Sequence, residues 1–481
     1  MFKKLLSGLF WVLLLNVLIK PFWILGIEVG VQNSVGAEEY GLYITIFNLA
    51  YIFNILLDIG VTNFNTRNIA QHPTLITKHL SGILGIKLML LALYLVVTFT
   101  VGLLKGYHSR QFVLLAFLAF NQFLNSLILY LRSNFEGLLL FRWDSLISIL
   151  DRAVMILICG ALLWLPSHPA FRIEYFVYAQ TVAYILTAVV ALSVLLSKVG
   201  FRGLRFSWPF TWVILRQSAP FALLVLLMAS YNRIDPMLLE DLAPRGQYQA
   251  GIYAGAFRLL DALTMIAYLV SVPLLPIFSR LTAHGSHQSS ELVVTVRWVT
   301  SLMLVFSITA AVVCWGLGAD LLSLLYTDHV AEYAPVFRVL VFGIIPISMT
   351  YIYGTLLTAA DRLRWLNILA TITLVVNIIV NLILIPRLGA EGSAWASLSA
   401  QSFMAVAQVI VAVRIFNIHI SPQYIIKILL FTLSIVGFFI IAPWQAWWPK
   451  LVLAMLLALT LALVLGFVDV KLIVKTLKNN T

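Results

Sequence analysis

Four basic side chains lie inside stretches that are otherwise apolar enough to cross a membrane: Lys20, Lys87, Arg233 and Arg258. A Lys or Arg at the centre of a spanning helix costs about 2.5–3.5 kcal/mol on insertion scales. Such residues usually face water or a partner, and bases that share a hydrated cavity can neutralise a phosphate through charge-assisted hydrogen bonds. We therefore treat these four as candidate substrate-binding residues.

Two of the four bases, Lys87 and Arg258, also have a simpler interpretation. Lys20 does not, because it lies about 18 Å into its predicted helix at 1.5 Å per residue, too deep to reach the headgroups easily. Lys87 could instead extend to the inner headgroups. Arg258 and Asp261 share one helix face and could neutralise each other.

Three acids are candidates for coupling transport to H⁺ or Na⁺: Asp58, Asp235 and Asp261. A structural salt bridge or a helix end is the alternative for Asp58 and Asp261. Arg233 and Asp235 are two residues apart and do not face each other within a helix. Pro236 disfavours helical geometry at Asp235, so this residue could mark a frayed, hydrated helix end.

Other chemistry is poorly represented. Cys159 and Cys314 lie in apolar runs, so the sequence predicts no disulfide framework and no metal site, and we expect neither a cofactor nor catalytic residues. Asn377 and Asn381 share a helix face, which is typical of hydrogen bonding between helices and less so of a substrate contact. The small residues of 392–402 indicate close helix packing.

The composition excludes a soluble protein. Of 481 residues, 62% are hydrophobic and 10% are charged, against about 45–50% and about 25% in soluble domains. The net charge of +12 would suggest a nucleic-acid partner in a soluble protein. Here it is explained by basic cytoplasmic loops, so we expect no nucleic acid.

Fourteen segments meet the length of about 20 apolar residues that a spanning helix needs. The first has a signal-like basic start but no small-x-small cleavage site, and we expect it to be an uncleaved helix. The predicted spans are 8–31, 40–61, 80–104, 111–131, 146–165, 173–197, 215–238, 253–279, 294–315, 336–359, 363–385, 391–413, 424–443 and 447–468.

The charge distribution predicts that both ends of the chain face the cytoplasm. With the first residue inside, 20 bases, Arg152 among them, fall in cytoplasmic segments and 7 in outer ones. The outer loops carry acids, including Glu39, Glu240 and Asp241. We expect a multi-pass protein of the cytoplasmic (inner) membrane of a bacterium.

The loops leave no room for a soluble catalytic domain, since none much exceeds twenty residues. The longest inner connectors, 132–145 and 198–214, mix Arg with aromatic residues, as basic topogenic loops or interfacial helices do. We expect an N-terminal lobe (1–197), an amphipathic cytoplasmic linker (198–214), a C-terminal lobe (215–415) and two further helices with a basic tail (416–481).

An internal repeat supports the two lobes. The pattern Gly-x-Tyr-x-x-x-Phe-x-Leu begins at Gly41 and again at Gly251, each time after a short outer loop that contains a glycine. The two copies are six predicted spans apart, so the lobes have the same orientation. Parallel repeats of this kind suit a transporter that alternates between two open states.

Four segments resemble the polysaccharide-transport branch of the multidrug/oligosaccharidyl-lipid/polysaccharide exporter superfamily, the O-antigen and capsule-type flippases. The fourth is similar to the family's Asn-x-x-x-Asn-x-x-x-Ile-Pro-x-x-Gly-x-x-Gly motif. The segments are 35–71, 130–152, 232–263 and 357–397.

The resemblance implies an all-α integral membrane fold of about fourteen helices, with two six-helix lobes and two extra C-terminal helices. It implies movement of an undecaprenyl-pyrophosphate-linked oligosaccharide from the inner to the outer leaflet for O-antigen, capsule or exopolysaccharide synthesis, driven by an H⁺ or Na⁺ gradient. The expected partners are this lipid-linked oligosaccharide and membrane lipids, with a polysaccharide polymerase and glycosyltransferases acting on the same material.

Two other functions are weighed against the flippase. A cation-coupled drug exporter of the same superfamily should present acids to its cargo, whereas the buried charges here are mainly basic. A membrane polysaccharide polymerase should have a large outer loop or paired carboxylates, and the sequence has neither.

Replacing Lys20 or Arg233 with Ala should abolish surface polysaccharide while the protein still reaches the membrane, because the pyrophosphate would lose its counter-charge. Surface polysaccharide and the amount of protein in the membrane are the two measurements. Unchanged polysaccharide in both variants would contradict the site assignment.

Overall fold

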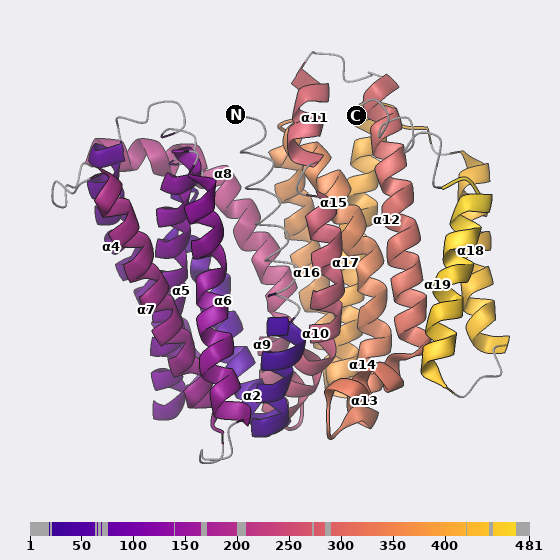
Figure 1. The fold of residues 1–481 in the computed structure, drawn as a ribbon, viewed down its shortest axis with the longest axis horizontal. Helices are drawn as coiled ribbons and strands as arrows, with labels where there is room; N and C mark the ends of the chain where they lie inside the picture. Colours follow the sequence, from indigo (N-terminus) through magenta and orange to yellow (C-terminus); the bar gives the residue numbers. More distant parts are fainter. Residues whose placement is uncertain are drawn as a thin grey trace. The chain divides into compact units, whose positions relative to one another are not determined.

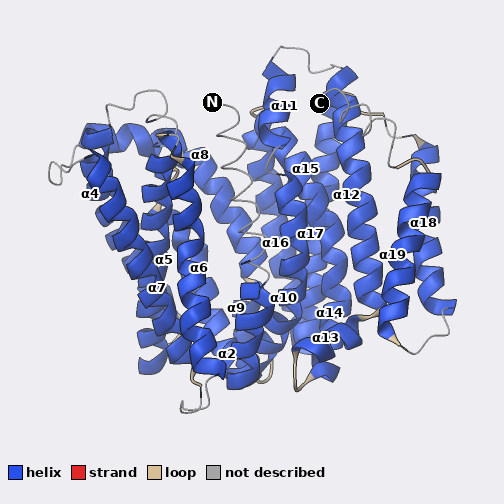
Figure 2. Cartoon of the chain, in the orientation of Figure 1, coloured by secondary structure: helices blue, strands red, loops and turns tan. Residues whose placement is uncertain are grey.

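A computed structural model covers the chain, and all regular structure in its described residues is helical (Figure 2). The described residues are 19, 22–62, 65, 69, 76–138, 140–164, 171–199, 208–271, 274–283, 290–419, 421–441 and 446–467. They form two compact units, residues 1–254 and 255–481, which divide inside one helix. Each unit is described by itself.

The first unit is a bundle built around one central helix, α5 (Figure 1). Its elements are η1 (Trp23–Glu28), α2 (Val29–Ile52), η2 (Phe53–Leu57), α4 (Ile76–Leu104), α5 (Ser109–Gly137), α6 (Phe141–Trp164), α7 (Ile173–Val199), α8 (Trp208–Arg233), α9 (Asp235–Leu242) and the start of α10 (Gly246–Ser271).

Helix α5 is central because its buried face carries polar groups that pair with its neighbours. It packs against α2, α4, α6 and α7. Asn121 accepts a 2.8 Å hydrogen bond from Thr181 of α7, and Asn134 accepts one of 3.0 Å from Asn65. In an apolar surrounding such bonds hold helices together, since lipid offers polar groups no alternative partner.

The chain reverses direction at Gly36, inside the residues assigned to α2. Gly36 has φ 84° and ψ 167°, a conformation that needs glycine. Trp23 and Tyr43 both contact Phe176, with ring centroids 5.9 and 5.3 Å away. A straight helix would separate Trp23 from Tyr43 by about 30 Å, so residues 22–35 and 37–57 belong to two successive spans, as the sequence predicts.

The second unit contains the rest of α10 and nine further helices, with a short 3₁₀ turn, in its described part (Figure 1). They are α11 (Leu274–Ala283), α12 (Ser290–Gly316), α13 (Gly318–Leu325), α14 (Val330–Leu340), η4 (Val341–Gly343), α15 (Ile344–Ala359), α16 (Leu363–Leu388), α17 (Ala390–Phe416), α18 (Pro422–Ile441) and α19 (Trp447–Val464).

Close packing of α16 on α17 confirms the expectation from the small residues of 392–402. A Cβ added at Gly392 would lie 2.5 Å from the carbonyl oxygen of Leu384, so only glycine allows this approach.

Asn381 donates 3.0 and 3.1 Å hydrogen bonds to the backbone and side-chain oxygens of Asn377, and both residues are fully buried.

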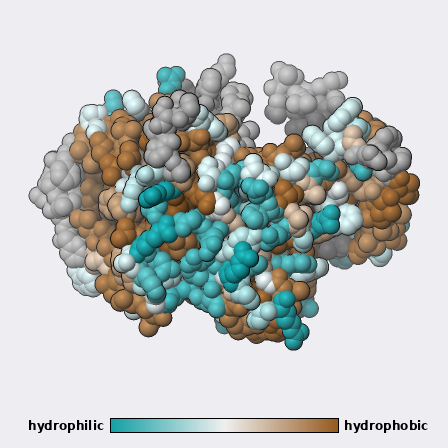
Figure 3. Space-filling view, turned by 90° about the horizontal axis from the view of Figure 1, so that it is seen from below, coloured by the Kyte–Doolittle hydropathy of each residue, from teal (hydrophilic) through white to brown (hydrophobic). Residues whose placement is uncertain are grey.

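The last two helices attach to the second unit through an apolar contact with α12. Phe431 and Ile435 of α18 and Ala458 and Ala462 of α19 are buried in one cluster with Ile308. Most other side chains of α18 and α19 are apolar and at least partly exposed, as expected for helices that face lipid. The end-on view of Figure 3 shows hydrophilic residues gathered on the helix ends and hydrophobic residues around the flanks.

The all-α, multi-span fold class is confirmed. The described residues contain 12 helices long and apolar enough to cross a membrane, or 13 when α8 and α9, bent by 47°, count as one span. These overlap the predicted spans from 40–61 onward, while most of the predicted first span, 8–31, lies outside the described residues.

One predicted connector is wrong, and two predicted segments are described only in part. The connector 132–145 is mostly helical, because α5 continues to Gly137 and α6 begins at Phe141. Within the predicted span 253–279, α10 ends at Ser271 and α11 begins at Leu274, while residues 272 and 273 lie outside the described residues. Of the predicted linker 198–214, residues 200–207 lie outside the described residues, and the lobe boundaries remain a prediction.

Candidate functional site

Lys87 and Asp58 form a buried ion pair in the first unit. The Nζ of Lys87, on α4, lies 2.8 Å from Oδ1 of Asp58, which follows η2. Lys87 also donates to the hydroxyl of Ser126 on α5 at 2.8 Å and to the carbonyl of Leu57 at 3.2 Å. Asp58 accepts a second hydrogen bond from the hydroxyl of Thr62.

These contacts bear on the simpler interpretations of Lys87 and of Asp58. Lys87 does not extend to the headgroups, since it is 1% exposed and its three donors are all used by oxygens of the first unit. Asp58 takes part in the structural salt bridge that the sequence left as its alternative. Removing the Asp58 carboxylate should cost about 3–5 kcal/mol, because the Lys87 charge would stay buried alone.

Arg233 has a different environment, although it is the same kind of intramembrane base. It ends α8 where the helix axis bends by 47° into α9. Its guanidinium lies over the ring of Tyr51, with Cζ 5.3 Å from the centroid. No ion pair joins Arg233 to a carboxylate within the described ranges, and, as predicted, it does not pair with Asp235.

Asp235 is not the hydrated helix end that Pro236 suggested. It begins α9, is fully buried, and accepts a 2.8 Å hydrogen bond from the hydroxyl of Tyr253. Proline is well tolerated at the second position of a helix, because its missing N–H would have no helical partner there. Asp235 therefore joins α9 to α10 inside the first unit.

Three predicted site residues remain, Arg258, Asp261 and Lys20. Arg258 and Asp261 both lie on α10 and are partly buried. No ion pair joins them to each other in the described part of the chain, so their mutual neutralisation has no support. Lys20 lies outside the described residues.

The structure adds one base that was wrongly counted as cytoplasmic. Arg152 lies well inside α6, with its Cζ 5.1 Å from the centre of the Trp23 ring. Its Nε is 3.6 Å from Asp151, and Glu28 and Tyr184 are close enough to interact electrostatically. The signal was present in the sequence, because Arg152 falls within the predicted span 146–165.

The two glycines that open the sequence repeat pack against each other's helices. A Cβ added at Gly41 would lie 1.7 Å from the carbonyl oxygen of Gln247, and one added at Gly251 would lie 1.7 Å from that of Ala37. Gln247 precedes Gly251 by four residues, as Ala37 precedes Gly41. This reciprocal contact, which we call the glycine crossing, is what a two-fold relation between the repeats would produce.

Ion pairs surround the same end of the first unit. Arg110 of α5 binds Glu39 of α2 at 2.6 Å and Glu174 of α7 at 2.7 Å. Lys105, just beyond α4, binds Asp241 at 2.9 Å. Each exposed pair contributes only about 0–1 kcal/mol, so these bonds orient the helix ends more than they stabilise the fold.

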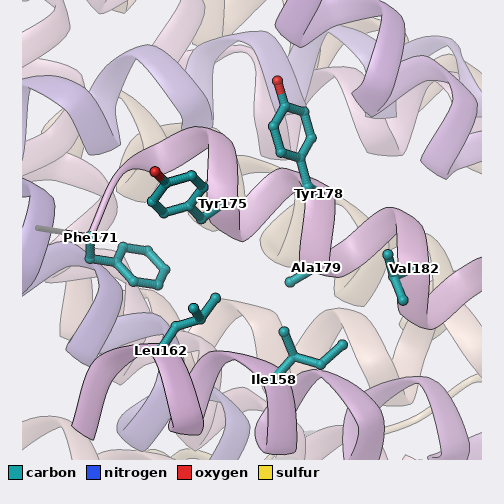
Figure 4. A pocket seen from close by; sticks show the side chains of 7 residues that line it. All are labelled: Ile158, Leu162, Phe171, Tyr175, Tyr178, Ala179 and Val182. Carbon is teal, nitrogen blue, oxygen red and sulfur yellow. The ribbon is translucent and has the colours of Figure 1, made fainter. Parts of the chain in front are cut away.

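A groove of about 350 Å³ between α6 and α7 is lined by seven residues without a formal charge (Figure 4). They are Ile158, Leu162, Phe171, Tyr175, Tyr178, Ala179 and Val182. Such a surface suits contact with hydrocarbon and offers a phosphate no counter-charge. The candidate site is therefore defined by the buried bases and not by this groove.

Comparison with known proteins decides the family. The family model described as polysaccharide biosynthesis protein matches residues 5–282, more than half of the chain. The chain belongs to the polysaccharide biosynthesis protein family. A second model, MatE, matches residues 220–383, and no curated protein matches the sequence.

Solved structures share the fold of this family member at low sequence identity. The lipid II flippase MurJ in an inward closed conformation has a TM-score of 0.67 and 13% identity, over 97% of this chain and 98% of that one. An inward-facing multidrug resistance MATE family transporter of the MOP superfamily has a TM-score of 0.64 and 15% identity, over 82% and 94%.

A third structure is a MOP superfamily transporter from Pyrococcus furiosus, described by the reverse polarity of its binding pocket. Its TM-score is 0.54 at 15% identity, over 87% of this chain and 95% of that one. These similarities confirm the fold that the resemblance implies.

Replacing Gly41 with Ala should lower the free energy of unfolding by about 1–3 kcal/mol, the cost of overpacking, because backbone atoms of α2 and α10 must separate. Gly251→Ala should have a similar effect, since the crossing is reciprocal. The midpoint of thermal unfolding of the purified protein measures both.

Gly437→Ala is the control, because nothing lies within 4 Å of a Cβ added there. This variant should match or slightly exceed the wild type. Equal midpoints for Gly41→Ala and Gly437→Ala would show that the glycine crossing does not stabilise the protein.

Proposed function

We propose that this protein is a flippase that moves a lipid-linked oligosaccharide, carried on undecaprenyl pyrophosphate, from the inner to the outer leaflet of a bacterial inner membrane. Membership of the polysaccharide biosynthesis protein family supports the glycan pathway. The fold supports transport rather than catalysis, since it is shared with transporters and a flippase. O-antigen, capsule and exopolysaccharide synthesis are the processes that need this step.

The observation that carries the proposal is that Arg233 lies over the aromatic ring of Tyr51 and has no carboxylate partner among the described residues. We therefore propose that its N–H groups bind a ligand. Those groups form a planar fork that binds phosphate oxygens through two parallel hydrogen bonds. A pyrophosphate needs such a partner, because the bilayer core does not solvate its charge.

Arg258 and Lys20 are also proposed as substrate-binding residues. Lys87 is not, because its three donors are already bound within the first unit. Two of the three acids are also engaged, Asp58 with Lys87 and Asp235 with Tyr253. We therefore favour Asp261 among the three for coupling to H⁺ or Na⁺.

We propose that the glycine crossing closes the outer side of the first unit in the conformation described above. Alternating access requires one side of a transporter to be closed while the other is open. Contacts between backbones that meet at glycines can separate and re-form without repacking large side chains. The ion pairs of Arg110 are exposed and weak enough to open with it.

The second candidate is a cation-coupled drug exporter, which the MatE match to residues 220–383 favours. An exporter of organic cations should offer its cargo unpaired acids. Of the candidate acids, Asp58 and Asp235 are taken by partners, whereas Arg233 has no carboxylate partner among the described residues. This charge distribution favours an anionic cargo.

Arg233→Gln should slow the appearance of surface polysaccharide by roughly tenfold or more, since a hydrogen bond to a charged group contributes about 1.5–3 kcal/mol. The measurement is the rate of polysaccharide appearance in cells that depend on this protein, normalised to the amount of protein in the membrane.

Arg245→Gln is the matched control. Arg245 also stacks on a tyrosine, Tyr248, at 4.0 Å, but it is exposed in the turn between α9 and α10. Its loss should change the rate less than about twofold. Equal rates in the two variants would refute the role of Arg233, and sensitivity to cationic dyes with normal polysaccharide in a null strain would favour the exporter.

A further inference from the structure

The second span of the first unit is broken where Lys87 approaches it. After α2 the backbone tightens into the 3₁₀ turn η2, and Ile59 and Gly60 then adopt left-handed conformations with φ 41° and 79°. Such a break removes regular helical hydrogen bonds and leaves carbonyl oxygens for other donors. The carbonyl of Leu57 accepts hydrogen bonds from Lys87 and from Ser126, both of 3.2 Å.

The groups around the Lys87 ammonium form a set of hard oxygen ligands. They are a carboxylate oxygen of Asp58 at 2.8 Å, a hydroxyl oxygen of Ser126 at 2.8 Å and the Leu57 carbonyl oxygen at 3.2 Å. Carboxylate, carbonyl and hydroxyl oxygens at an unwound helix are the ligands with which transporters coordinate a small monovalent cation. One negative charge also matches one positive charge.

The burial of Lys87 is more than a salt bridge requires. Its side chain is 1% exposed, whereas Asp58 is 24% exposed. The ammonium therefore lies deeper than its carboxylate partner, among oxygens of a helix break. The Tyr130 ring, with its centroid 5.8 Å from Nζ, adds a further group that favours a cation.

We propose that Lys87 is a tethered cation. Its ammonium permanently occupies a monovalent-cation site formed by Leu57, Asp58 and Ser126, and the first unit consequently binds no sodium ion there. Removing the ammonium without filling its space should create a sodium site. This inference concerns the first unit alone and does not depend on the proposed substrate.

The test is the thermal unfolding midpoint of the purified full-length protein in sodium chloride and in choline chloride at equal ionic strength. The wild type should unfold at the same temperature in both. Lys87→Ala should unfold at a lower temperature in choline and recover in sodium, with a saturable dependence on sodium concentration. Binding of ²²Na⁺ should rise to one additional ion per chain in this variant.

Two further variants separate a cation site from a simple salt bridge. Lys87→Met fills the space of the side chain and should be destabilised with no response to sodium. Lys87→Ala combined with Asp58→Asn removes the carboxylate and should lose the sodium response of Lys87→Ala.

The proposal is overturned if Lys87→Ala unfolds at the same temperature in both salts. It is also overturned if this variant does not fold even in sodium chloride. It is equally overturned if the wild type gains stability in sodium and Asp58→Asn abolishes that gain. None of these measurements uses the lipid-linked substrate, so they remain interpretable whatever the outcome of the Arg233 experiment.

Discussion

The constraint on which this structure depends is that the membrane core does not solvate charge. A spanning helix tolerates a Lys or Arg only if the protein supplies a partner or water. The first unit meets this requirement in three ways: Lys87 is enclosed by oxygens, Arg152 lies among Trp23, Asp151 and Glu28, and Arg233 rests on an aromatic ring. The number of partners around each base separates Lys87 and Arg152, which are enclosed, from Arg233, which we propose binds a ligand.

Helix contacts follow the same physics, because apolar surfaces gain little from meeting each other in lipid. Association depends on close approach and on internal hydrogen bonds. Glycines allow that approach at the glycine crossing and at Gly392, while buried Asn and Thr side chains join α5 to α7. Helices α18 and α19 attach mainly along two apolar clusters, with one 2.9 Å hydrogen bond between the hydroxyls of Tyr424 and Ser301.

These features connect fold and proposed activity. A transporter of a pyrophosphate-linked lipid needs a base that can bind the cargo. A base whose hydrogen-bond donors are all used by protein oxygens cannot bind it. Arg233 and Lys87 have the same sign and both lie within predicted spans, yet of the two only Arg233 lacks an acidic partner among the described residues. The bend between α8 and α9 places it where backbone geometry already departs from a regular helix.

The sequence by itself determined the membrane-spanning class, most of the spans, the reversal near Gly36 and the family, because hydrophobic length and glycine positions are local properties of the chain. It also identified Lys87, Asp58 and Arg233 as the residues to explain. Only the tertiary structure decided which of them pair. Lys87 and Asp58 are 29 residues apart, and no helical periodicity relates them. Their contact exists because η2 breaks its helix beside α4, and that break depends on packing and not on local propensity.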